Sequence, residues 1–429
     1  MGSEMCIRDS SNPAVRQFPI EWVRSCFPAL NMGDSFTFFD NGAGAQVPQA
    51  VIDAVQNHLL RRQVQRGGRY SRSREVDASI QRARESIATF LNAREADEVA
   101  FGMNATSFIR IVSLAMAETL RDRKEIILSN MDHEANIATW IGLERYGVEI
   151  RWWEMRPDGT LDVEDLKPLL NDRTRLVACT LASNALGSIV DVKQAAQLAH
   201  AHGAELFLDA VHYAPHGPLD VQQMDCDYLV CSGYKIFGPH MGFLWGKRKA
   251  LEALPTFRED FIPDAIPTKI EVGTFVYENV AGMDAAIGYL EDLGNRVQND
   301  GRNNSRRATL VLAMEAIKNY EAMLSSRVLA GLACMDKIFV YGIQNSGSVH
   351  MRVPTICFNV QGVPPAQLAT ALAERGIGVR DGNMYSPRLL KRLCIPPEPG
   401  AVRASLVHYN SSEEIDRFLA VLHDIAETQ

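Results

Sequence analysis

Two charged side chains stand where a charge is costly to bury. Asp209 ends the apolar run Ala204–Leu208, and Lys235 follows shortly after the apolar run Tyr228–Cys231. A buried carboxylate or ammonium group is unfavourable unless an opposite charge meets it, so the two could form a structural ion pair. An amine and an acid are also what pyridoxal phosphate requires, one for its aldehyde carbon and one for its pyridine nitrogen. Asp209 and Lys235 are therefore compatible with either a structural ion pair or a pyridoxal-phosphate site.

The elements that must position these residues are short apolar runs alternating with helical patterns. Each of four such runs is followed at once by a polar segment; these segments are residues 129–136, 183–184, 209–212 and 232–235. Alternating strands and helices predict a mostly parallel sheet. Since parallel strands point the same way, we expect the four polar segments to meet at one edge of the sheet, where open α/β folds bind ligands.

A further segment could hold a phosphate group. Gly102–Ser107, which includes Ala105 and Thr106, precedes a helical pattern. Free backbone N–H groups at a helix N-terminus bind anions, although Asn, Thr and Ser at this place also serve as ordinary caps. Ser232 and Thr274 could add hydroxyl groups to the same phosphate.

Two histidines also stand near these segments. His133 lies in the polar segment after the first of the four strands, and His212 lies three residues after Asp209. His133 could lie flat over the cofactor ring, and His212 could reach its phenolic oxygen. His212 and His216 are four apart, but Pro215 and Gly217 interrupt any helix there, so we expect no metal site.

Composition narrows the class of protein. The chain has 429 residues, 46% of them hydrophobic, and a formal net charge of −8. We find no long charged run, which argues against nucleic acid as a partner, and no stretch of roughly 18 uncharged apolar residues, which argues against a membrane span. Eight cysteines lack CxxC spacing, so we expect reduced thiols, with Cys179 and Cys231 in the core, and a cytoplasmic location.

The order of patterns also predicts domains. We expect an α/β fold with a mostly parallel central sheet of the seven-stranded type, helices on both faces, and a smaller α+β C-terminal domain. The predicted divisions are a non-native leader over 1–10, an N-terminal segment over 11–35 that packs with the small domain, a large cofactor-binding domain over 36–277, and a small domain over 278–429. Within the small domain we expect helices near 281–293 and 303–324 and strands at 355–360 and 403–408.

From about Phe38 onward the chain resembles the class V aminotransferase family of fold-type I pyridoxal-phosphate enzymes, and within it the cysteine desulfurase and selenocysteine lyase branch. The matching stretches occur in family order over nearly the whole length: residues 39–46, 132–136, 183–187, 209–212, 232–235, 238–239, 271–274 and 402–406.

The resemblance implies roles in binding the cofactor. Lys235 is the lysine that binds the aldehyde carbon, Asp209 is the partner of the pyridine nitrogen, and His133 is the stacking residue. His212 stands where relatives have Gln or His on the ring oxygen. The remaining residues implied or expected at the cofactor are Ala105, Thr106, Asn184, Ser232, Tyr234 and, from a neighbouring subunit, Thr274.

The resemblance also implies a substrate site and an assembly. Asn184 and Arg403 would meet a small amino acid, with Arg403 binding its α-carboxylate by two hydrogen bonds. Arg380 is a second candidate for that group, and Ala43 and Tyr385 stand on loops that shape the pocket. The family implies a homodimer with active sites at the interface.

Two departures from the family pattern bear on the reaction. Desulfurases carry a nucleophilic cysteine five residues after the arginine that matches Arg380, and this chain has Tyr385 there. A phenol cannot form a persulfide, and Cys394, between Leu393 and Ile395, is expected to be a buried thiol. In addition, Tyr234 replaces the histidine usually found before the lysine.

These features predict a lyase acting at the β-carbon of a small α-amino acid without a persulfide cysteine. The leaving group would be selenium, a sulfinate, a sulfoxide or a β-carboxylate, with carbon–carbon bond formation as a further option. A class V aminotransferase or an amino-acid epimerase is the main alternative. A cofactor-holding protein without catalytic activity is a third.

Overall fold

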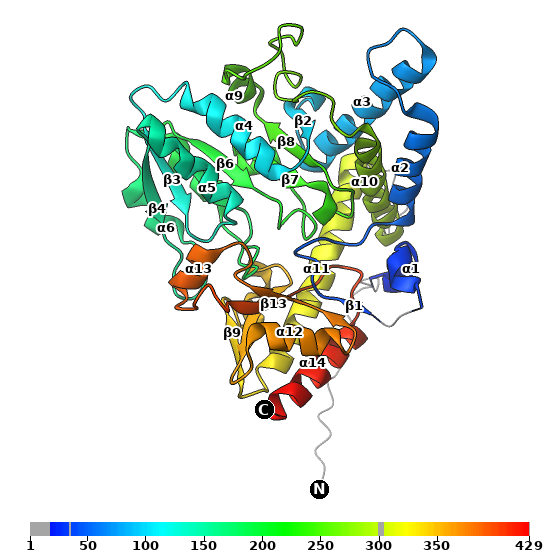
Figure 1. The fold of residues 1–429 in the computed structure, drawn as a ribbon, viewed down its shortest axis with the longest axis vertical. Helices are drawn as coiled ribbons and strands as arrows, with labels where there is room; N and C mark the ends of the chain where they lie inside the picture. The colour runs from blue at the N-terminus through cyan, green and yellow to red at the C-terminus, as the bar shows by residue number, and fades with distance from the viewer. Residues whose placement is uncertain (1–17, 34–35, 299–303, 429) are drawn as a thin grey trace.

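A seven-stranded sheet forms the centre of the upper lobe in Figure 1. The computed structural model describes residues 18–33, 36–298 and 304–428. The strand order is β2-β8-β7-β6-β5-β3-β4, and only β8 runs antiparallel to its neighbours. The strands are β2 (Val99–Gly102), β3 (Glu125–Ser129), β4 (Glu149–Trp153), β5 (Thr174–Thr180), β6 (Glu205–Asp209), β7 (Tyr228–Ser232) and β8 (Gly242–Gly246). The predicted mostly parallel α/β sheet is confirmed.

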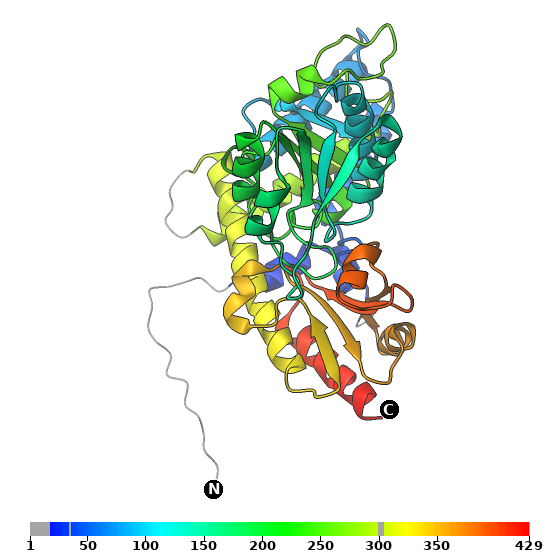
Figure 2. The ribbon, with the colours of Figure 1, turned by 90° about the vertical axis from the view of Figure 1, so that its left-hand side faces the viewer.

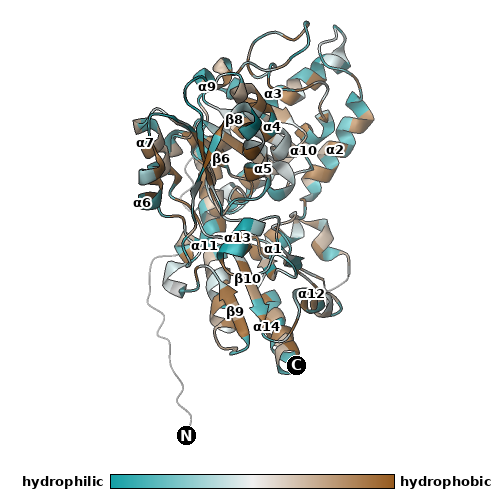
Figure 3. Cartoon of the chain, turned by 60° about the vertical axis from the view of Figure 1, so that its left-hand side comes forward, coloured by the Kyte–Doolittle hydropathy of each residue, from teal (hydrophilic) through white to brown (hydrophobic). Residues whose placement is uncertain are grey.

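Both faces of the sheet are covered, which explains why its strands read as continuous apolar runs. In β6, Leu206 and Leu208 belong to one core cluster, and Phe207 between them belongs to the other. Successive side chains of a strand point to opposite faces, so a single apolar strand contributes to the hydrophobic cores on both sides of the sheet. Figure 3 shows apolar residues gathered on strands such as β8 and β9.

Two sets of helices cover the faces of this sheet. The helices of the upper lobe are α2 (Gln49–Arg62), α3 (Ser71–Leu91), α4 (Ala105–Ala117), α5 (Ala135–Ile141), α6 (Val163–Leu166), α7 (Val192–Ala201), α8 (Val221–Met224) and α9 (Arg248–Ala253). Apolar residues of α3 and α7 belong to one core cluster, and those of α4 and α5 belong to the other. The predicted helices on both faces are therefore present.

The lower lobe contains a four-stranded antiparallel sheet of order β12-β13-β10-β9. Its strands are β9 (Ile338–Tyr341), β10 (Thr355–Val360), β12 (Arg380–Gly382) and β13 (Ala401–Ser405), and a separate parallel pair joins β1 (Thr37–Phe38) to β11 (Ile377–Gly378). The helices here are α12 (Pro365–Ala373), α13 (Pro387–Arg392) and α14 (Ser412–Glu427). This lobe is the predicted smaller α+β unit, and the strand predicted over 403–408 in fact ends at Ser405.

Two long helices, α10 (Tyr277–Val297) and α11 (Arg306–Leu332), connect the lobes. Both extend beyond the apolar patterns that predicted them. α10 packs against α2 and α3 of the upper lobe. The first half of α11 contributes to the large core and the second half to the core of the lower lobe, and Figures 1 and 2 show it spanning both. The boundary at 277/278 stays a prediction.

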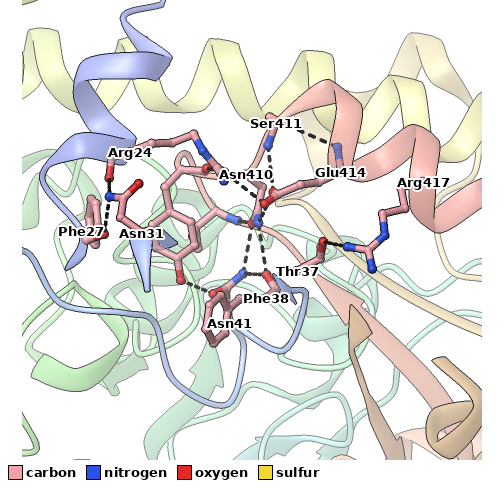
Figure 4. A network of polar contacts seen from close by, with 12 residues as sticks. Arg24, Phe27, Asn31, Thr37, Phe38, Asn41, Asn410, Ser411, Glu414 and Arg417 are labelled. Atoms are coloured by element: carbon pink, nitrogen blue, oxygen red, sulfur yellow. Dashed lines mark hydrogen bonds and ion pairs between the residues drawn. The ribbon is translucent and has the colours of Figure 1, made fainter. Parts of the chain in front are cut away.

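The N-terminal segment lies against both lobes. In α1 (Ile20–Ser25), Trp22 stacks on Tyr289 of α10, and Arg24 donates to the Tyr409 carbonyl at 2.8 Å. Figure 4 shows the polar network that continues from Arg24 to Asn41, whose Nδ2 donates to the Ser405 carbonyl at 2.9 Å. This network holds the segment after Phe39 beside the sheet of the lower lobe. The predicted leader over 1–10 lies outside the described residues.

Within the described ranges, we find no helix with the length and apolarity needed to cross a membrane.

Candidate active site

A cavity opens at the carboxyl edge of the central sheet. Its volume open to water-sized groups is about 80 Å³. The polar segments that follow β3, β5, β6 and β7 all contribute to it, as the sequence predicted. Its lining residues are Asn104, Ala105, Thr106, Ile109, His133, Ala135, Thr180, Asn184, Asp209, Val211, His212, Ser232, Tyr234 and Lys235.

Asp209, the last residue of β6, presents a buried carboxylate to this cavity. Its Oδ1 accepts the N–H of Val211 at 2.9 Å. Burial raises the pKa of this carboxyl group, while the Val211 N–H and the charge of Lys235 act in the opposite direction. Within the described ranges Asp209 has no salt-bridge partner, so the simple ion pair with Lys235 does not form. The site holds a buried acid that a cationic ring nitrogen would stabilise.

Lys235 lies in the short 3-10 turn Gly233–Lys235 that follows β7, and its side chain is buried. Burial, with the positive charge of Arg403, lowers the pKa of its amine from 10.5 to about 8, against the attraction of Asp209. A large fraction of the amine is therefore neutral near pH 8. A neutral amine is the form that attacks a carbonyl carbon and accepts a proton.

His133 follows β3 and is held in a defined tautomer. Its Nδ1 accepts the N–H of Ala135 at 3.1 Å, which leaves the proton on Nε2. Burial, with the nearby charges of Lys235 and Arg403, lowers the pKa of His133 to about 4. The turn before it is fixed by Asp132, whose Oδ1 accepts from Asn136 at 2.7 Å. His133 is therefore a neutral imidazole at one side of the cavity.

The N-terminus of α4 also lines the cavity. The Asn104 side chain caps the helix by accepting the Ser107 N–H at 2.9 Å. The N–H groups of Ala105 and Thr106 have no acceptor among the described residues, and Ser232 lies on the same wall. Gly242 of β8 permits this approach, because a Cβ there would stand 2.5 Å from the backbone of Asn104. This end can hold a phosphate group.

A cluster of charges stands beside the cavity. Arg403 of β13 is buried and donates through Nη1 to the Asn184 carbonyl at 2.9 Å and through Nη2 to Asp40 at 3.0 Å. Arg380 of β12 donates to the same Asp40 at 2.9 and 2.7 Å. The Nε of Arg403 is buried and has no hydrogen-bond partner among the described residues. Arg403 therefore keeps a buried free donor.

Tyr385 stands at the edge of the site on a loop held in place by hydrogen bonds. Its carbonyl accepts the Glu134 N–H at 2.8 Å, and its ring centroid is 5.6 Å from that of His133. Asn184 donates to the Met384 carbonyl at 2.7 Å. Asn184 therefore ties the loop to the cavity wall, while the Tyr385 side chain remains 59% exposed.

Several predicted site residues do not line the cavity, namely Ala43, Thr274, Arg380, Tyr385 and Arg403. Thr274 is exposed and accepts a hydrogen bond from Gln65 at 2.9 Å. Tyr234 does line the cavity, with its ring stacked on that of His240 at 4.9 Å. The roles assigned from the resemblance stay predictions.

The sequence reasoning missed three residues. Asp40 had a signal, since it stands inside the matched stretch 39–46, but its two arginine partners are more than 300 residues away. Thr180 and Thr355 gave no signal, because a threonine in a strand is ordinary. The expectation of buried Cys179 and Cys231 is confirmed, whereas Cys394 is exposed and the expectation of a buried thiol was wrong. Cys394 follows the end of α13 with φ of +58°, and that turn carries it outward.

The residues present fit pyridoxal phosphate. Asp209 lacks an ion-pair partner among the described residues, Lys235 is a buried amine with a lowered pKa, and the free N–H groups of α4 supply an anion site in the same cavity. Such a cavity at the carboxyl edge of this sheet defines a fold-type I enzyme that uses pyridoxal phosphate.

Comparisons with known proteins agree. Residues 37–418 match the family described as aminotransferase class-V, and the chain belongs to this family. It is 34% identical over 415 residues to the aminotransferase-like protein FGM3 of Gibberella zeae, covering 94% of this chain and 98% of that one. It is 34% identical over 419 residues to a probable cysteine desulfurase of Synechocystis, covering 93% and 94%.

Solved structures lead to the same family. A cysteine desulfurase from Thermococcus onnurineus matches with a TM-score of 0.86 at 26% identity, over 97% of this chain and 100% of that one. A cysteine desulfurase from Escherichia coli matches with a TM-score of 0.82 at 26% identity, over 96% and 99%. The chain is a pyridoxal-phosphate enzyme similar to cysteine desulfurases, and the predicted family, fold class and cofactor are confirmed.

Proposed function

We propose that this chain is a lyase that removes a β-substituent from a small α-amino acid without a persulfide-forming cysteine. The leaving group would be selenium, a sulfinate, a sulfoxide or a β-carboxylate, and carbon–carbon bond formation could follow. The observation that carries the proposal is Tyr385, whose ring centroid lies 5.6 Å from that of the cavity-lining His133, at the sequence position where the resemblance implies the attacking thiol of desulfurases. A leaving group that departs without being attacked by a thiol fits this arrangement.

The thiols of the described residues support the same view. None of them lines the cavity. Cys394 contributes to a different hollow, together with Tyr341 and Pro396. Burial raises the pKa of Cys357 to about 12, even though Arg403 is close. Because the thiolate is the reactive form, Cys357 is inert at neutral pH.

Four residues would act on the bound cofactor and substrate. Pyridoxal phosphate, when bound, withdraws electrons from the substrate α-carbon. Asp209 would keep the ring nitrogen protonated, and His133 would lie over the ring. Lys235 would bind the aldehyde carbon, then accept the α-proton through its amine once substrate has displaced it. Arg403 would bind the α-carboxylate with its unpaired Nε–H.

The other predicted cofactor contacts follow from the same geometry. Ala105, Thr106 and Ser232 would bind the phosphate at the N-terminus of α4. His212, which lines the cavity near Asp209, would donate to the phenolic oxygen of the ring. Tyr234 would border the phosphate end in place of the histidine found in relatives.

A second copy of the chain is part of the proposal. Thr274 does not reach the cavity of its own chain, and three large apolar side chains nearby in the sequence, Phe257, Phe261 and Val272, are 101%, 81% and 66% exposed. Exposed apolar groups of this size favour a protein interface. A second copy covering this segment would receive the Thr274 hydroxyl at its phosphate site. A Phe257→Glu/Phe261→Glu double variant should then become monomeric and lose cofactor affinity; an unchanged dimer would contradict this interface.

The seven described cysteines are free, which suits the reducing cytoplasm. A cytoplasmic location is therefore included in the proposal.

The deciding experiment is a screen of small amino acids against the cofactor-loaded protein, with spectra and products recorded together. Release of a β-fragment without any keto-acid acceptor supports the lyase. Amino transfer to pyruvate in equal amounts supports an aminotransferase, which the fungal aminotransferase-like relative favours. Racemised substrate would indicate an epimerase. No spectral change with any amino acid would indicate a cofactor-holding protein without catalytic activity.

A further inference from the structure

Thr355 connects the lower lobe to the cavity of the upper lobe. It is the first residue of β10, it is completely buried, and its Oγ1 lies 2.9 Å from Nε2 of His212. His212 itself lines the cavity. The hydroxyl therefore contacts the side of the imidazole that is turned away from the Nδ1 atom.

The direction of this hydrogen bond follows from the surroundings of the hydroxyl. In the part of the chain that the structure describes, His212 is the only partner of the Thr355 hydroxyl. A buried donor without an acceptor is rarer and costlier than an acceptor with a spare lone pair. The Thr355 O–H therefore donates to Nε2, and Nε2 accepts.

His212 is neutral, so it carries a single N–H. Burial lowers its pKa well below 6.5, and the facing groups Lys235, His216, Arg403 and His133 act in the same direction. A neutral imidazole whose Nε2 accepts must carry its proton on Nδ1.

We infer that Thr355 is a positioning residue that fixes His212 in the Nδ1–H tautomer and so directs that N–H into the cavity, toward the ring oxygen of the cofactor. The inference deepens the proposed function, because it rests on His212 facing that oxygen. The tautomer itself can be measured without any reaction.

The position of Thr355 is determined by its backbone contacts and not by its hydroxyl group. Thr355 pairs with Ser405 of β13. Gly187, in the left-handed region at φ of +82°, lies against it, and a Cβ there would stand 2.8 Å from the Thr355 carbonyl oxygen. Valine has the shape of threonine without the hydroxyl, so Thr355→Val removes the hydrogen bond while keeping these contacts.

The first experiment uses cofactor-free protein labelled with 15N in its histidines. In the wild type, the ring 15N shifts of His212, identified by their loss in His212→Gln, should show a protonated Nδ1. Thr355→Val should move the proton toward Nε2 or give a mixture, and Thr355→Ser should keep the wild-type signature. Unchanged shifts in Thr355→Val, or equal changes in both variants, would overturn the inference.

The second experiment uses the cofactor-loaded protein and the pH dependence of its absorbance. An N–H donated to the ring oxygen stabilises its deprotonated form. Loss of this bond in Thr355→Val should therefore raise the midpoint of the transition by about one pH unit, equivalent to a tenfold change in the protonation equilibrium. Thr355→Ser should restore the profile, and in a His212→Gln background Thr355→Val should have no further effect. An equal shift in that background would show that Thr355 does not act through His212.

Discussion

Arg380 and Asp40 form a close pair in which Nε and Nη2 of the arginine donate to Oδ2 of the carboxylate at 2.9 and 2.7 Å. Asp40 also accepts from Arg403 at 3.0 Å. Two guanidinium groups share one carboxylate, so one positive charge of this cluster is unbalanced. The arrangement fits the proposed binding of one substrate carboxylate at Arg403 and leaves Arg380 paired with Asp40.

Replacing Asp40 should change which substrates bind. In Asp40→Asn the pairing of Arg380 is weakened and the cluster gains positive charge. We expect aspartate to gain affinity over alanine by about tenfold, since hydrogen bonds to charged groups contribute roughly 1.5–3 kcal/mol. Spectral titration of the loaded protein with both amino acids measures this. Asp381→Asn, at the exposed residue next to Arg380 in β12, is the matched control. An equal gain for both amino acids would contradict a role of Asp40 in substrate specificity.

Arg403→Ala should weaken the binding of amino acids far more than the binding of simple amines. The guanidinium is buried with a free Nε, and loss of its charge-assisted hydrogen bond to a carboxylate, roughly 1.5–3 kcal/mol, predicts a decrease in affinity of about tenfold or more. Methylamine and alanine titrated against the same preparation give the comparison. Equal losses for the two ligands would remove Arg403 from the carboxylate site.

Lys235→Ala should abolish turnover and covalent attachment of the cofactor. The amine is buried in the cavity with a lowered pKa, and among the described residues no other lysine lines the cavity. Borohydride reduction followed by peptide mass analysis should place the label on Lys235 in the wild type and nowhere in the variant. Lys193→Ala, on the exposed side of α7, should label normally. A label on another lysine in Lys235→Ala would contradict the assignment.

The same lysine should make the stability of the cofactor-free protein depend on pH. Its pKa is about 8 when folded and near 10.5 when unfolded. Between these values the unfolded chain binds more protons, so stability rises with pH across this window. The full penalty, about 3 kcal/mol, is present below pH 8. Lys235→Met should therefore be more stable than the wild type at pH 7, with a difference that narrows toward pH 10 in urea unfolding. A constant difference would mean that the amine is not desolvated.

Thiol modification should leave the reaction intact. The exposed cysteines Cys334 and Cys394 should react first with iodoacetamide, and Cys394→Ser should keep full turnover because Cys394 does not line the cavity. Peptide mass analysis and product assays on one sample test this. If turnover decreases in proportion to the labelling of Cys394, a thiol-dependent mechanism is supported instead.

Many of the cavity-lining residues could be predicted from the sequence, because polar residues that directly follow an apolar run mark the end of a strand. Asp209 and Lys235 each follow a run of buried apolar residues, and the parallel arrangement of strands brings such ends together. The helix limits were less accurate: α11 continues to Leu332, beyond the predicted 324, because its second half packs in a different core from its first.

The sequence by itself predicted the sheet and the residues at its strand ends, since these follow from local patterns in the order of the chain, and the matched stretches predicted the family and the cofactor by resemblance. Only the tertiary structure decided that Asp40 occupies Arg380, that Thr355 lies against His212, and that Cys394 is exposed. The first two facts depend on contacts between segments 340 and 143 residues apart in the chain, and the third depends on the turn that follows α13. A local pattern determines which element a residue belongs to, but the packing of the lobes determines what its side chain meets.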